Sequence, residues 1–600
     1  GYTFDKFVYP KSMDSSRLKI RYAEDGGMHK DGVIELRRGV EDLSLGNSHY
    51  AQVRILVDGN RYLKGMAVYS DDLPDGVDVL FNTNKKRGTP TEDVLKKIKD
   101  DPDNPFGSLI KAGGQSYYTD ANGQRQLSLI NKRAEEGDWG EWADKLPSQF
   151  LSKQSLTLVN KQLNLAASDK MAEFDEICSL TNPTVKKSLL RSFADDCDSA
   201  AVHLQAAALP RQKYQVILPI TSMKDNEVYA PNYKNGETVA LIRYPHGGTF
   251  EIPILTVNNK QAEARRVLGN TPKDAIGINS KVAERLSGAD FDGDTVMVIP
   301  CNSRNSKIKI TSTPPLKGLE GFDPKLEYGG KPEGTFKQMR NTQKEMGVIS
   351  NLITDMTLKG ATQDELARAV RHSMVVIDAE KHKLDYKQSE IDNGISSLKK
   401  KYQGAVDEDG KYHEGASTLI SRAKSEVSVV KRQGSPRIDE ETGELVWKTV
   451  DDPIYTDKRT GKTKVRTQPS TKMAEAKDAY TLVSEADTPI ERAYANYANK
   501  MKALGNQARL EILATGKVPY SSTAKETYQA EVDSLNAKLN VALKNAPRER
   551  QAQTMANAVV AAKKQDNPDM TKAEIKKASQ QALTQARAIV GAKRETIQIT

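Results

Sequence analysis

The sequence predicts a multidomain α+β protein, and three observations favour this fold class. A chain of 600 residues with 37% hydrophobic content can bury several cores, which corresponds to about three to five domains. Residues 1 to 100 and 210 to 312 carry short alternating apolar runs, which are typical of strands. Residues 313 to 430 and 471 to 592 instead carry apolar residues at three- and four-residue spacing, which is typical of helices.

The composition narrows the class of protein. A formal net charge of +9 is a mild basic excess, which fits a polyanionic partner and also an ordinary soluble protein. Cys178, Cys197 and Cys301 are too few and too scattered for a disulfide framework or a zinc cluster, so we expect reduced, buried thiols. No stretch is apolar enough to cross a bilayer and no signal peptide opens the chain, so we expect a cytoplasmic protein. The chain starts at Gly1 without Met and stops at Thr600 within a strand-like pattern, so we expect both ends to have been cut from a longer protein.

The first hundred residues predict a series of strands. Gln52–Val57 and Arg61–Tyr69 alternate as two strands around the turn Asp58–Asn60, which predicts a hairpin. Val77–Phe81 alternates as a third strand. Lys64 lies within the second of these strands, where a lysine is most often a solvated surface charge.

The segment from residue 101 to 209 is mixed. Ser155–Leu209 is helical by pattern and is interrupted at Pro183. Trp139 and Trp142 belong to a short acidic segment, and two tryptophans so close together are more often core residues than platforms for base stacking.

The next segment returns to strands. The candidates are Tyr214–Ile220, Thr238–Ile242, Thr249–Thr256 and Thr295–Ile299. Arg243 follows the second candidate directly, just before a turn.

The C-terminal half is helical around one polar segment. Gln338–Thr357 and Gln363–Arg371 predict two helices after the proline-rich residues 313 to 315. Residues 431 to 470 are polar and rich in Lys, Arg, Gly and Pro, which fits either a basic arm on a nucleic-acid channel or a plain linker.

The last predicted segment, residues 471 to 592, consists of helices broken near three prolines, Pro519, Pro547 and Pro568. Within it, Tyr494, Tyr497 and Met501 recur at helical spacing and are predicted to be core.

The strongest chemical signal is a group of three acids at alternate positions, Asp290, Asp292 and Asp294. Ionised carboxylates this close repel one another unless a cation lies among them. Hard oxygen ligands suit Mg²⁺, which takes part of its shell from substrate phosphates. Gly293 removes a side chain at the turn, so the backbone can fold tightly around an ion.

The three acids have three other interpretations. An acidic surface turn is the simplest. An EF-hand loop starting at Asp290 requires Gly and Glu at its sixth and twelfth positions, where this chain has Thr295 and Cys301. A phosphatase of the aspartyl-phosphate type has an apolar strand leading into its acids, whereas here the strand Thr295–Ile299 leads out.

The run Ala289-Asp-Phe-Asp-Gly-Asp294 resembles the catalytic signature of the two-barrel RNA polymerases. This superfamily includes the largest subunit of cellular RNA polymerase, the RNA-silencing polymerases and single-chain phage and prophage enzymes. The resemblance implies two double-psi β-barrels flanking a catalytic cleft, with a helical connector and a long helical C-terminal region. It covers roughly residues 50 to 90 and 210 to 385.

Further motifs carry the same resemblance. Leu63-Lys-Gly-Met66 is similar to the first barrel of the RNA-silencing polymerases, in which lysines contact the RNA 3′ end and the incoming triphosphate. Lys64 matches the first of these lysines, and either Lys85 or Lys86 matches the second. Arg243-Tyr-Pro resembles an Arg-x-Pro element whose arginine contacts the nucleotide sugar.

Two helical segments downstream also resemble the RNA-silencing family. They are Lys344–Asn351, in which Met346 replaces a leucine, and His372–Lys381, which has one extra residue before Asp378.

From these patterns and the resemblance we expect six regions. They are a first barrel module with insertions and basic residues (1–165), a helical connector (166–209), a second barrel carrying the Asp triad (210–312), a helical region downstream of the active site (313–430), a polar basic arm or linker (431–470) and a truncated helical C-terminal region (471–600).

The function that the resemblance implies is template-directed RNA synthesis by a nucleotidyltransferase. We expect a DNA-dependent, phage-type single-chain enzyme, which would act in the host cytoplasm. The alternatives are an RNA-dependent RNA polymerase of the silencing type and an inactive scaffold that only binds nucleic acid. The partners would be a nucleic-acid template, the RNA product and ribonucleoside triphosphates, without a membrane.

The expected mechanism uses two Mg²⁺ ions about 4 Å apart, one of them held tightly by Asp290, Asp292 and Asp294. Lys64 is expected to point into the same cleft as the triad, across a gap too wide for a direct salt bridge, because the triad alone would repel a triphosphate.

Overall fold

The computed structural model describes residues 8–103, 105–107, 110–133, 148–243, 252–286, 289–304, 306–312, 316–319, 321–516 and 521–592. The chain forms two compact units, each built from two separate stretches of sequence. The first unit combines residues 1–144 with 212–316, and the second combines residues 145–211 with 317–600.

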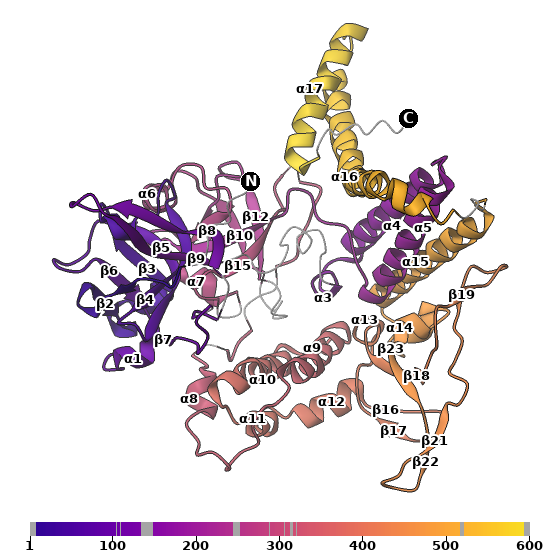
Figure 1. The fold of residues 1–600 in the computed structure, drawn as a ribbon, viewed down its shortest axis with the longest axis horizontal. Coiled ribbons are helices and arrows are strands. Elements are labelled where there is room, and N and C mark those ends of the chain that lie inside the picture. Colours follow the sequence, from indigo (N-terminus) through magenta and orange to yellow (C-terminus); the bar gives the residue numbers. More distant parts are fainter. Residues whose placement is uncertain are drawn as a thin grey trace. The chain divides into compact units, whose positions relative to one another are not determined.

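The N-terminal stretch of the first unit folds into a nine-stranded sheet (Figure 1). Its main path runs in the order β2-β6-β3-β5-β4-β9-β8, while β1 pairs with β4 and β7 pairs with β5. The strands are β1 (Ser12–Met13), β2 (Leu18–Arg21), β3 (Val33–Arg37), β4 (Tyr50–Val57), β5 (Arg61–Ser70), β6 (Val79–Asn82), β7 (Lys96–Lys97), β8 (Ile110–Thr119) and β9 (Arg125–Arg133), with the short helix α1 (Thr91–Val94) before β7.

The second stretch of this unit forms a closed six-stranded barrel in the order β10-β14-β11-β13-β12-β15. The helix α6 lies between β13 and β14, and α7 lies between β14 and β15. The bounds are β10 (Lys213–Pro219), β11 (Glu227–Tyr229), β12 (Thr238–Arg243), β13 (Ile254–Val257), α6 (Ala262–Leu268), β14 (Ala275–Ile278), α7 (Ser280–Glu284) and β15 (Thr295–Pro300).

The two stretches repeat one pattern of strand pairing. In the barrel, β10–β14 and β11–β13 are parallel, whereas β11–β14 and β12–β13 are antiparallel. In the sheet, β2–β6 and β3–β5 are parallel, whereas β3–β6 and β4–β5 are antiparallel. Five consecutive strands therefore match in order and direction. The antiparallel strand after β12 is β15, which closes the barrel, and the one after β4 is β9, which continues the sheet to β8.

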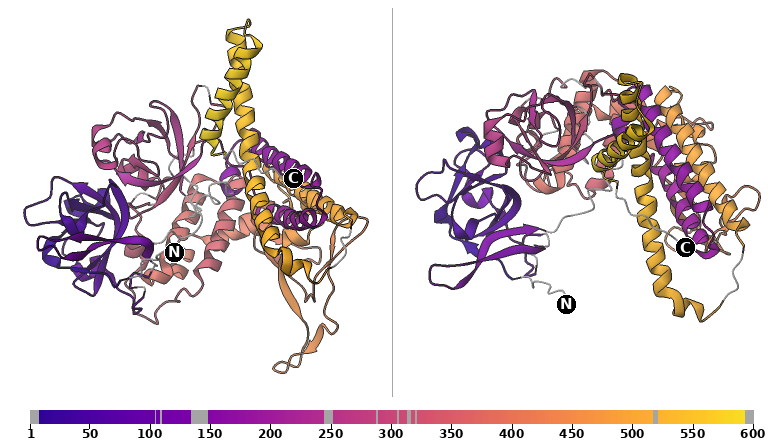
Figure 2. Two further views of the ribbon diagram at one scale, coloured as in Figure 1. Left: turned by 45° about the horizontal axis from the view of Figure 1, so that its top comes forward. Right: turned by 90° about the horizontal axis from the view of Figure 1, so that it is seen from above.

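The sheet and the barrel lie side by side, and one hydrophobic cluster joins them (Figure 2). Val33 and Met66 of the sheet belong to the same cluster of buried side chains as Ile217, Leu241 and Val296 of the barrel. Burial of a valine or isoleucine side chain contributes roughly 1.5–3 kcal/mol, so this cluster holds the two stretches together as one unit.

The second unit is mainly helical. Its helices are α3 (Ser148–Leu151), α4 (Leu156–Cys178), α5 (Pro183–His203), α8 (Pro324–Tyr328), α9 (Thr342–Leu358), α10 (Gln363–His382), α11 (Tyr386–Asp392), α12 (Ile395–Gln403), α13 (Leu419–Arg422), α14 (Lys472–Glu475), α15 (Pro489–Ala514), α16 (Ala524–Asp566) and α17 (Lys572–Val590).

The core of α15 confirms a prediction from helical spacing. Tyr494, Tyr497 and Met501 are buried, on a helix that packs against α4 and α5. Pro183 separates α4 from α5 as predicted, because it occupies the first turn of α5, where its missing N–H is not needed.

The predicted break at Pro547 is wrong. Helix α16 runs through this proline from Ala524 to Asp566. A proline inside a helix costs about 3 kcal/mol, but the alanine-, lysine- and glutamine-rich turns on both sides favour the helix and one face packs on α17 (Figure 2). Pro568 does lie between α16 and α17, whereas Pro519, Trp139 and Trp142 lie outside the described residues.

Short two-stranded sheets project from the helical unit. β18 and β23 form an antiparallel stem, and the hairpins β19–β20 and β21–β22 lie between them in sequence. The bounds are β16 (Ala405–Val406), β17 (Tyr412–His413), β18 (Glu426–Val430), β19 (Arg437–Ile438), β20 (Leu445–Val446), β21 (Ile454–Thr456), β22 (Thr463–Val465) and β23 (Thr467–Thr471).

The predicted fold class is confirmed. The chain is a multidomain α+β protein with a closed β-barrel and a helical C-terminal region. Within the described part of the chain, none of the helices combines the length and the apolar character needed to span a bilayer.

Candidate active site

The three predicted aspartates meet on the loop that leads from α7 into β15. One carboxylate oxygen from each of Asp290, Asp292 and Asp294 lies within 4.8 Å of the other two. The backbone N–H of Asp290 donates to Asp294 Oδ2 at 3.0 Å, which closes the loop on itself. The buried strand β15 begins at Thr295 and fixes the end of the loop. Three acids at alternate positions thereby become one cluster.

The electrostatics of the cluster fit a cation. Burial, the hydrogen bond with Asp292 and the neighbouring carboxylates together raise the pKa of Asp290 far above its usual range. Burial also acts to raise the pKa of Asp292, but the hydrogen bond from Asp290 and the positive charges of Lys64, Lys96 and Arg243 hold it below its ordinary value. The cluster thus cannot easily carry three negative charges by itself. Three hard carboxylate oxygens at this spacing are a donor set that suits a divalent cation such as Mg²⁺.

The N-terminal sheet holds this loop through its backbone. Phe291 N–H donates to the carbonyl of Asp31 at 2.7 Å. Gly32 has a φ of 95°, and a Cβ atom on it would lie 2.7 Å from the backbone nitrogen of Asp292. Only glycine permits both this conformation and this close approach.

Gln52 on β4 holds the loop from the other side. Its Nε2 donates to the carbonyl of Asp292 at 3.0 Å. Gly293 has a φ of 122°, and a side chain on it would collide with Gln52. Gly293 therefore serves the contact with the sheet, and the tight wrapping of the loop around an ion, expected from the sequence, stays a prediction.

Lys64 on β5 points at the triad. Its Nζ lies 3.7 Å from Asp292 Oδ2, and both side chains are 27% exposed. The expectation that the gap would be too wide for a salt bridge is therefore wrong. The physical reason is the close approach of the backbones, because the contacts of Gly32 and Gln52 bring the sheet directly against the triad loop.

Lys85 and Lys86, the two candidates for a second lysine, lie after β6. Lys85 Nζ donates to the backbone carbonyl of Asp93 near α1, and Lys86 is exposed. The lysine that lowers the pKa of Asp292 together with Lys64 is Lys96 on β7, which the sequence analysis missed. Tyr62 pairs with Lys96 across β5 and β7, and Lys64 is two residues from Tyr62 on the same strand. Because β5 and β7 are distant in sequence, no local sequence pattern predicts that they pair.

Arg243 ends β12 beside the triad. Its Nη2 lies 3.0 Å from Asp294 Oδ2, and its Nη1 lies 3.5 Å from the carbonyl of Leu286. The register of β12 against β15 places Arg243 opposite Val296, two residues after Asp294. Arg243 therefore lies on the strand paired with β15, and its ion pair with Asp294 orients the guanidinium.

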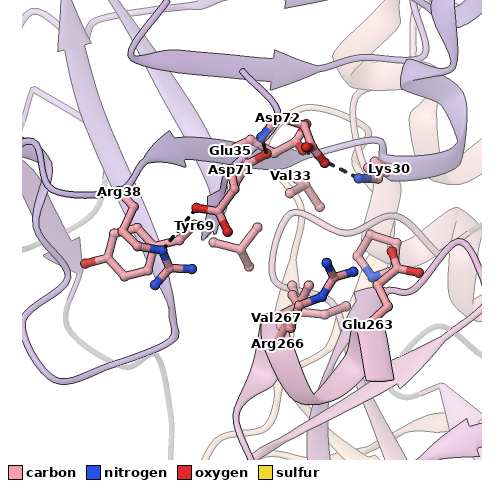
Figure 3. A pocket seen from close by; sticks show the side chains of 14 residues that line it. Lys30, Val33, Glu35, Arg38, Tyr69, Asp71, Asp72, Glu263, Arg266 and Val267 are labelled. Atoms are coloured by element: carbon pink, nitrogen blue, oxygen red, sulfur yellow. Dashed lines mark hydrogen bonds and ion pairs between the residues drawn. The ribbon is translucent and has the colours of Figure 1, made fainter. Parts of the chain in front are cut away.

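A cavity of about 120 Å³ lies between the sheet and the barrel (Figure 3). Lys30 and Val33 line it from the sheet, and Glu263 and Arg266 line it from the barrel. Gly32, which contacts the triad loop, lies between Lys30 and Val33 in the chain, so one short segment forms both the cavity wall and the contact with the triad.

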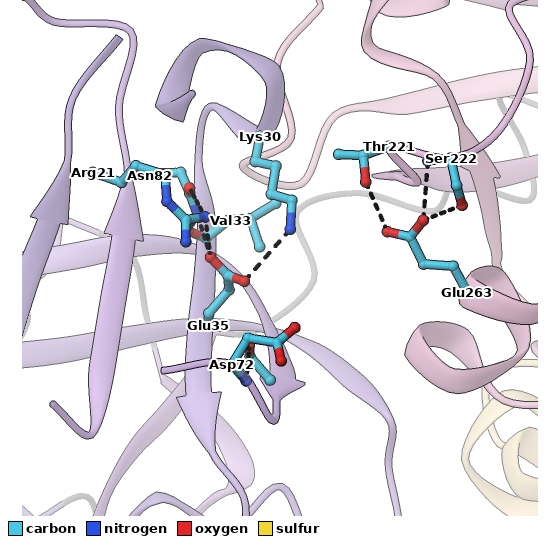
Figure 4. Close-up of polar contacts among 10 residues, drawn as sticks. Arg21, Lys30, Val33, Glu35, Asp72, Asn82, Thr221, Ser222 and Glu263 are labelled. Atoms are coloured by element: carbon cyan, nitrogen blue, oxygen red, sulfur yellow. Dashed lines mark hydrogen bonds and ion pairs between the residues drawn. The ribbon is translucent and has the colours of Figure 1, made fainter. Parts of the chain in front are cut away.

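A buried ion-pair network anchors that segment (Figure 4). Arg21 Nη1 and Asn82 Nδ2 donate to Glu35 Oε2 at 2.8 and 3.1 Å, and Lys30 Nζ lies 3.5 Å from Glu35 Oε1. Glu35 is only 5% exposed, so these partners replace the water that its carboxylate loses on burial.

Comparisons with known proteins give a likeness to solved structures. No protein-family model matches the chain, and no curated protein matches it. Among solved structures, the chain is similar to the RNA-dependent RNA polymerase QDE-1 from Thielavia terrestris, with 14% sequence identity and a TM-score of 0.33. The likeness covers 63% of this chain and 42% of that polymerase, so the chain spans less than half of its length.

Proposed function

We propose that the protein is a nucleotidyltransferase that synthesises RNA on a nucleic-acid template. The observation that carries the proposal is the convergence of three carboxylates with Lys64 and Arg243 in one site built by the sheet and the barrel. Phosphoryl transfer needs positioning and charge stabilisation and no covalent nucleophile, and this set of side chains offers both.

The triad would hold the divalent cations that the reaction needs. Asp290, Asp292 and Asp294 supply the oxygen ligands, and Gln52 and Gly32 fix the loop that carries them. When bound, a pair of Mg²⁺ ions supplies activation of the RNA 3′ hydroxyl and balances charge on the pyrophosphate leaving group.

Lys64 and Lys96 would stabilise the negative charge of the triphosphate. Both lysines lie on strands of the sheet, Lys64 Nζ is 3.7 Å from Asp292 Oδ2, and the positive charge of each lysine lowers the pKa of Asp292. Because a carboxylate cluster repels phosphate, cations on the opposite side of the site are required for a triphosphate to approach. The binding of the triphosphate by Lys85 or Lys86 stays a prediction.

Arg243 would contact the ribose of the incoming nucleotide while Asp294 orients its guanidinium. Arg243→Lys removes the fork of donors and is expected to reduce the preference for ribonucleotides over deoxynucleotides by roughly 10- to 100-fold. Incorporation rates measured with both nucleotide types test this, with Arg265→Lys on α6, an exposed arginine of the same barrel, as the matched control.

The ratio of the two rates separates two roles of this arginine. If Arg243 only positions Asp294, Arg243→Lys lowers both rates equally and the ratio stays unchanged. That result would remove the sugar contact from the proposal and leave the triad assignment intact.

The template is proposed to be DNA, because the short first barrel module and the poorly matched helical tail of the sequence fit a phage-type single-chain enzyme. RNA is the second candidate, because Leu63–Met66 resembles the first barrel of the RNA-silencing polymerases. Primer extension with ribonucleoside triphosphates and Mg²⁺, on DNA and RNA templates of the same sequence, tests the function and the choice together. Extension on DNA is expected. Extension on RNA alone would reverse the choice of template, and binding of both templates without any extension would favour an inactive scaffold.

A further inference from the structure

The hairpin β21–β22 projects from the helical unit beyond the β18–β23 stem (Figure 1). Nearly all of its residues from Ile454 to Val465 are exposed, on both faces of the ribbon. The cross-strand pair of Ile454 and Val465 is 58% and 48% exposed. A two-stranded hairpin without a packed face is only marginally stable in water, so contact with a binding partner would stabilise this one.

The neighbouring hairpin β19–β20, in contrast, packs against the helix α15. Arg509 of α15 is buried and donates through Nε to the carbonyl of Gly443 at 2.7 Å. Gly443 also approaches Asn506 of α15 so closely that a Cβ atom would collide with its carbonyl. The hairpin β19–β20 is therefore fixed on a helix.

The charges of the two hairpins differ in sign. Between Arg437 and Val446 there are four acidic residues and one basic residue. Between Pro453 and Arg466 there are five basic residues and one acidic residue. Asp457, the single acid, is paired with Lys464 at 2.6 Å. The projecting hairpin therefore carries a surplus of four positive charges.

The projecting hairpin holds a cation against an exposed aromatic ring. The guanidinium of Arg466 lies 5.3 Å from the ring centroid of Tyr455, which is 39% exposed. Tyr455 is paired across the ribbon with Lys464. Lys458, Arg459 and Lys462 form the exposed loop between the strands. A cationic ribbon with an accessible aromatic side chain matches the chemistry of a phosphate backbone with exposed bases or sugars.

We propose that the β21–β22 hairpin is an arm that binds the phosphate backbone of nucleic acid. The proposal stands on the exposure, the charge surplus and the unpacked faces of the hairpin. It rests on the proposed function only for the choice of nucleic acid over another polyanion. Backbone contacts of this kind hold a template or product in place and do not read its sequence.

The test compares two triple variants of the full chain. The arm variant replaces Lys458, Arg459 and Lys462 by Ala, and the control variant replaces Lys325, Lys337 and Lys400 by Ala. All six residues are exposed and lie in the same unit, so both variants lose the same charge. Fluorescence anisotropy at several salt concentrations gives the affinity for labelled duplex DNA, duplex RNA and a single strand, and sedimentation with phosphatidylserine vesicles tests a membrane surface.

The arm variant is expected to bind nucleic acid on the order of 10-fold more weakly at about 0.1 M salt. Its slope of log affinity against log salt should fall by up to ~2.7, since each lost phosphate contact contributes about 0.9 for duplex DNA. The three nucleic-acid probes identify the form that the arm prefers. Circular dichroism and the melting temperature check that both variants are folded.

Several results would overturn the proposal. These are an unchanged affinity and slope in the arm variant, an equal loss in the control variant, or a loss of vesicle binding with nucleic-acid binding intact. Failure of primer extension by the parent chain would instead contradict the proposed function, and the binding assay would still decide the role of the arm.

Discussion

Asp292→Ala is expected to abolish nucleotide addition, with a loss of roughly 10³-fold or more. Asp292 contributes one of the three carboxylate oxygens that lie within 4.8 Å of one another. It is also the carboxylate that faces Lys64 at 3.7 Å, so it connects the acidic and basic sides of the site. Removing it leaves two carboxylates, and the charge stabilisation that a bound cation supplies is worth several kcal/mol.

Two measurements separate this effect from a folding defect. Primer extension gives the rate, and electron paramagnetic resonance with Mn²⁺ gives the cation affinity independently of activity. Asp225→Ala is the matched control, because Asp225 is an exposed aspartate in the same barrel stretch. Template binding should survive in both variants. Synthesis within a few-fold of the parent, or unchanged Mn²⁺ binding in Asp292→Ala, would remove the triad from the active site.

The triad could be predicted because its signal is local. Three acids at alternate positions followed by an apolar strand lie within eleven residues, and the fold brings them together on one loop. The same holds for the hairpin β4–β5, whose turn residues lie between its two strands, and for the helix α15, whose apolar spacing lies within one segment. In these elements the local pattern and the tertiary structure agree.

The parts that were missed depend on contacts between distant segments. Gln52 contacts the carbonyl of a residue 240 positions later, and the role of Gly293 is defined by that contact. Lys96 acts on Asp292 because the two-residue strand β7 pairs with β5, and a strand so short has no periodicity to detect. The distance between Lys64 and Asp292 was overestimated for the same reason, since the packing of Gly32 on the triad loop has no counterpart in the local sequence.

The second large effect is expected at Lys64. Lys64→Met keeps the apolar stem of the side chain and removes its charge. The rate of nucleotide addition should fall roughly 10²- to 10³-fold, as for the loss of one donor that stabilises transition-state charge. Folding should change little, because the lysine side chain is 27% exposed and its ion pair with Asp292 is long.

Lys96 and Lys97 provide a matched pair of controls on the neighbouring strand β7. Successive side chains on a strand point to opposite faces, and the positive charge of Lys96 is among those that lower the pKa of Asp292. Lys96→Met should therefore reduce the rate more than Lys97→Met, which should leave it unchanged. Rates measured over a range of triphosphate concentrations show whether kcat, KM or both change. If Lys64→Met and Lys97→Met have the same rate, the cationic side of the site lies elsewhere and the facing arrangement of Lys64 and the triad has no catalytic role.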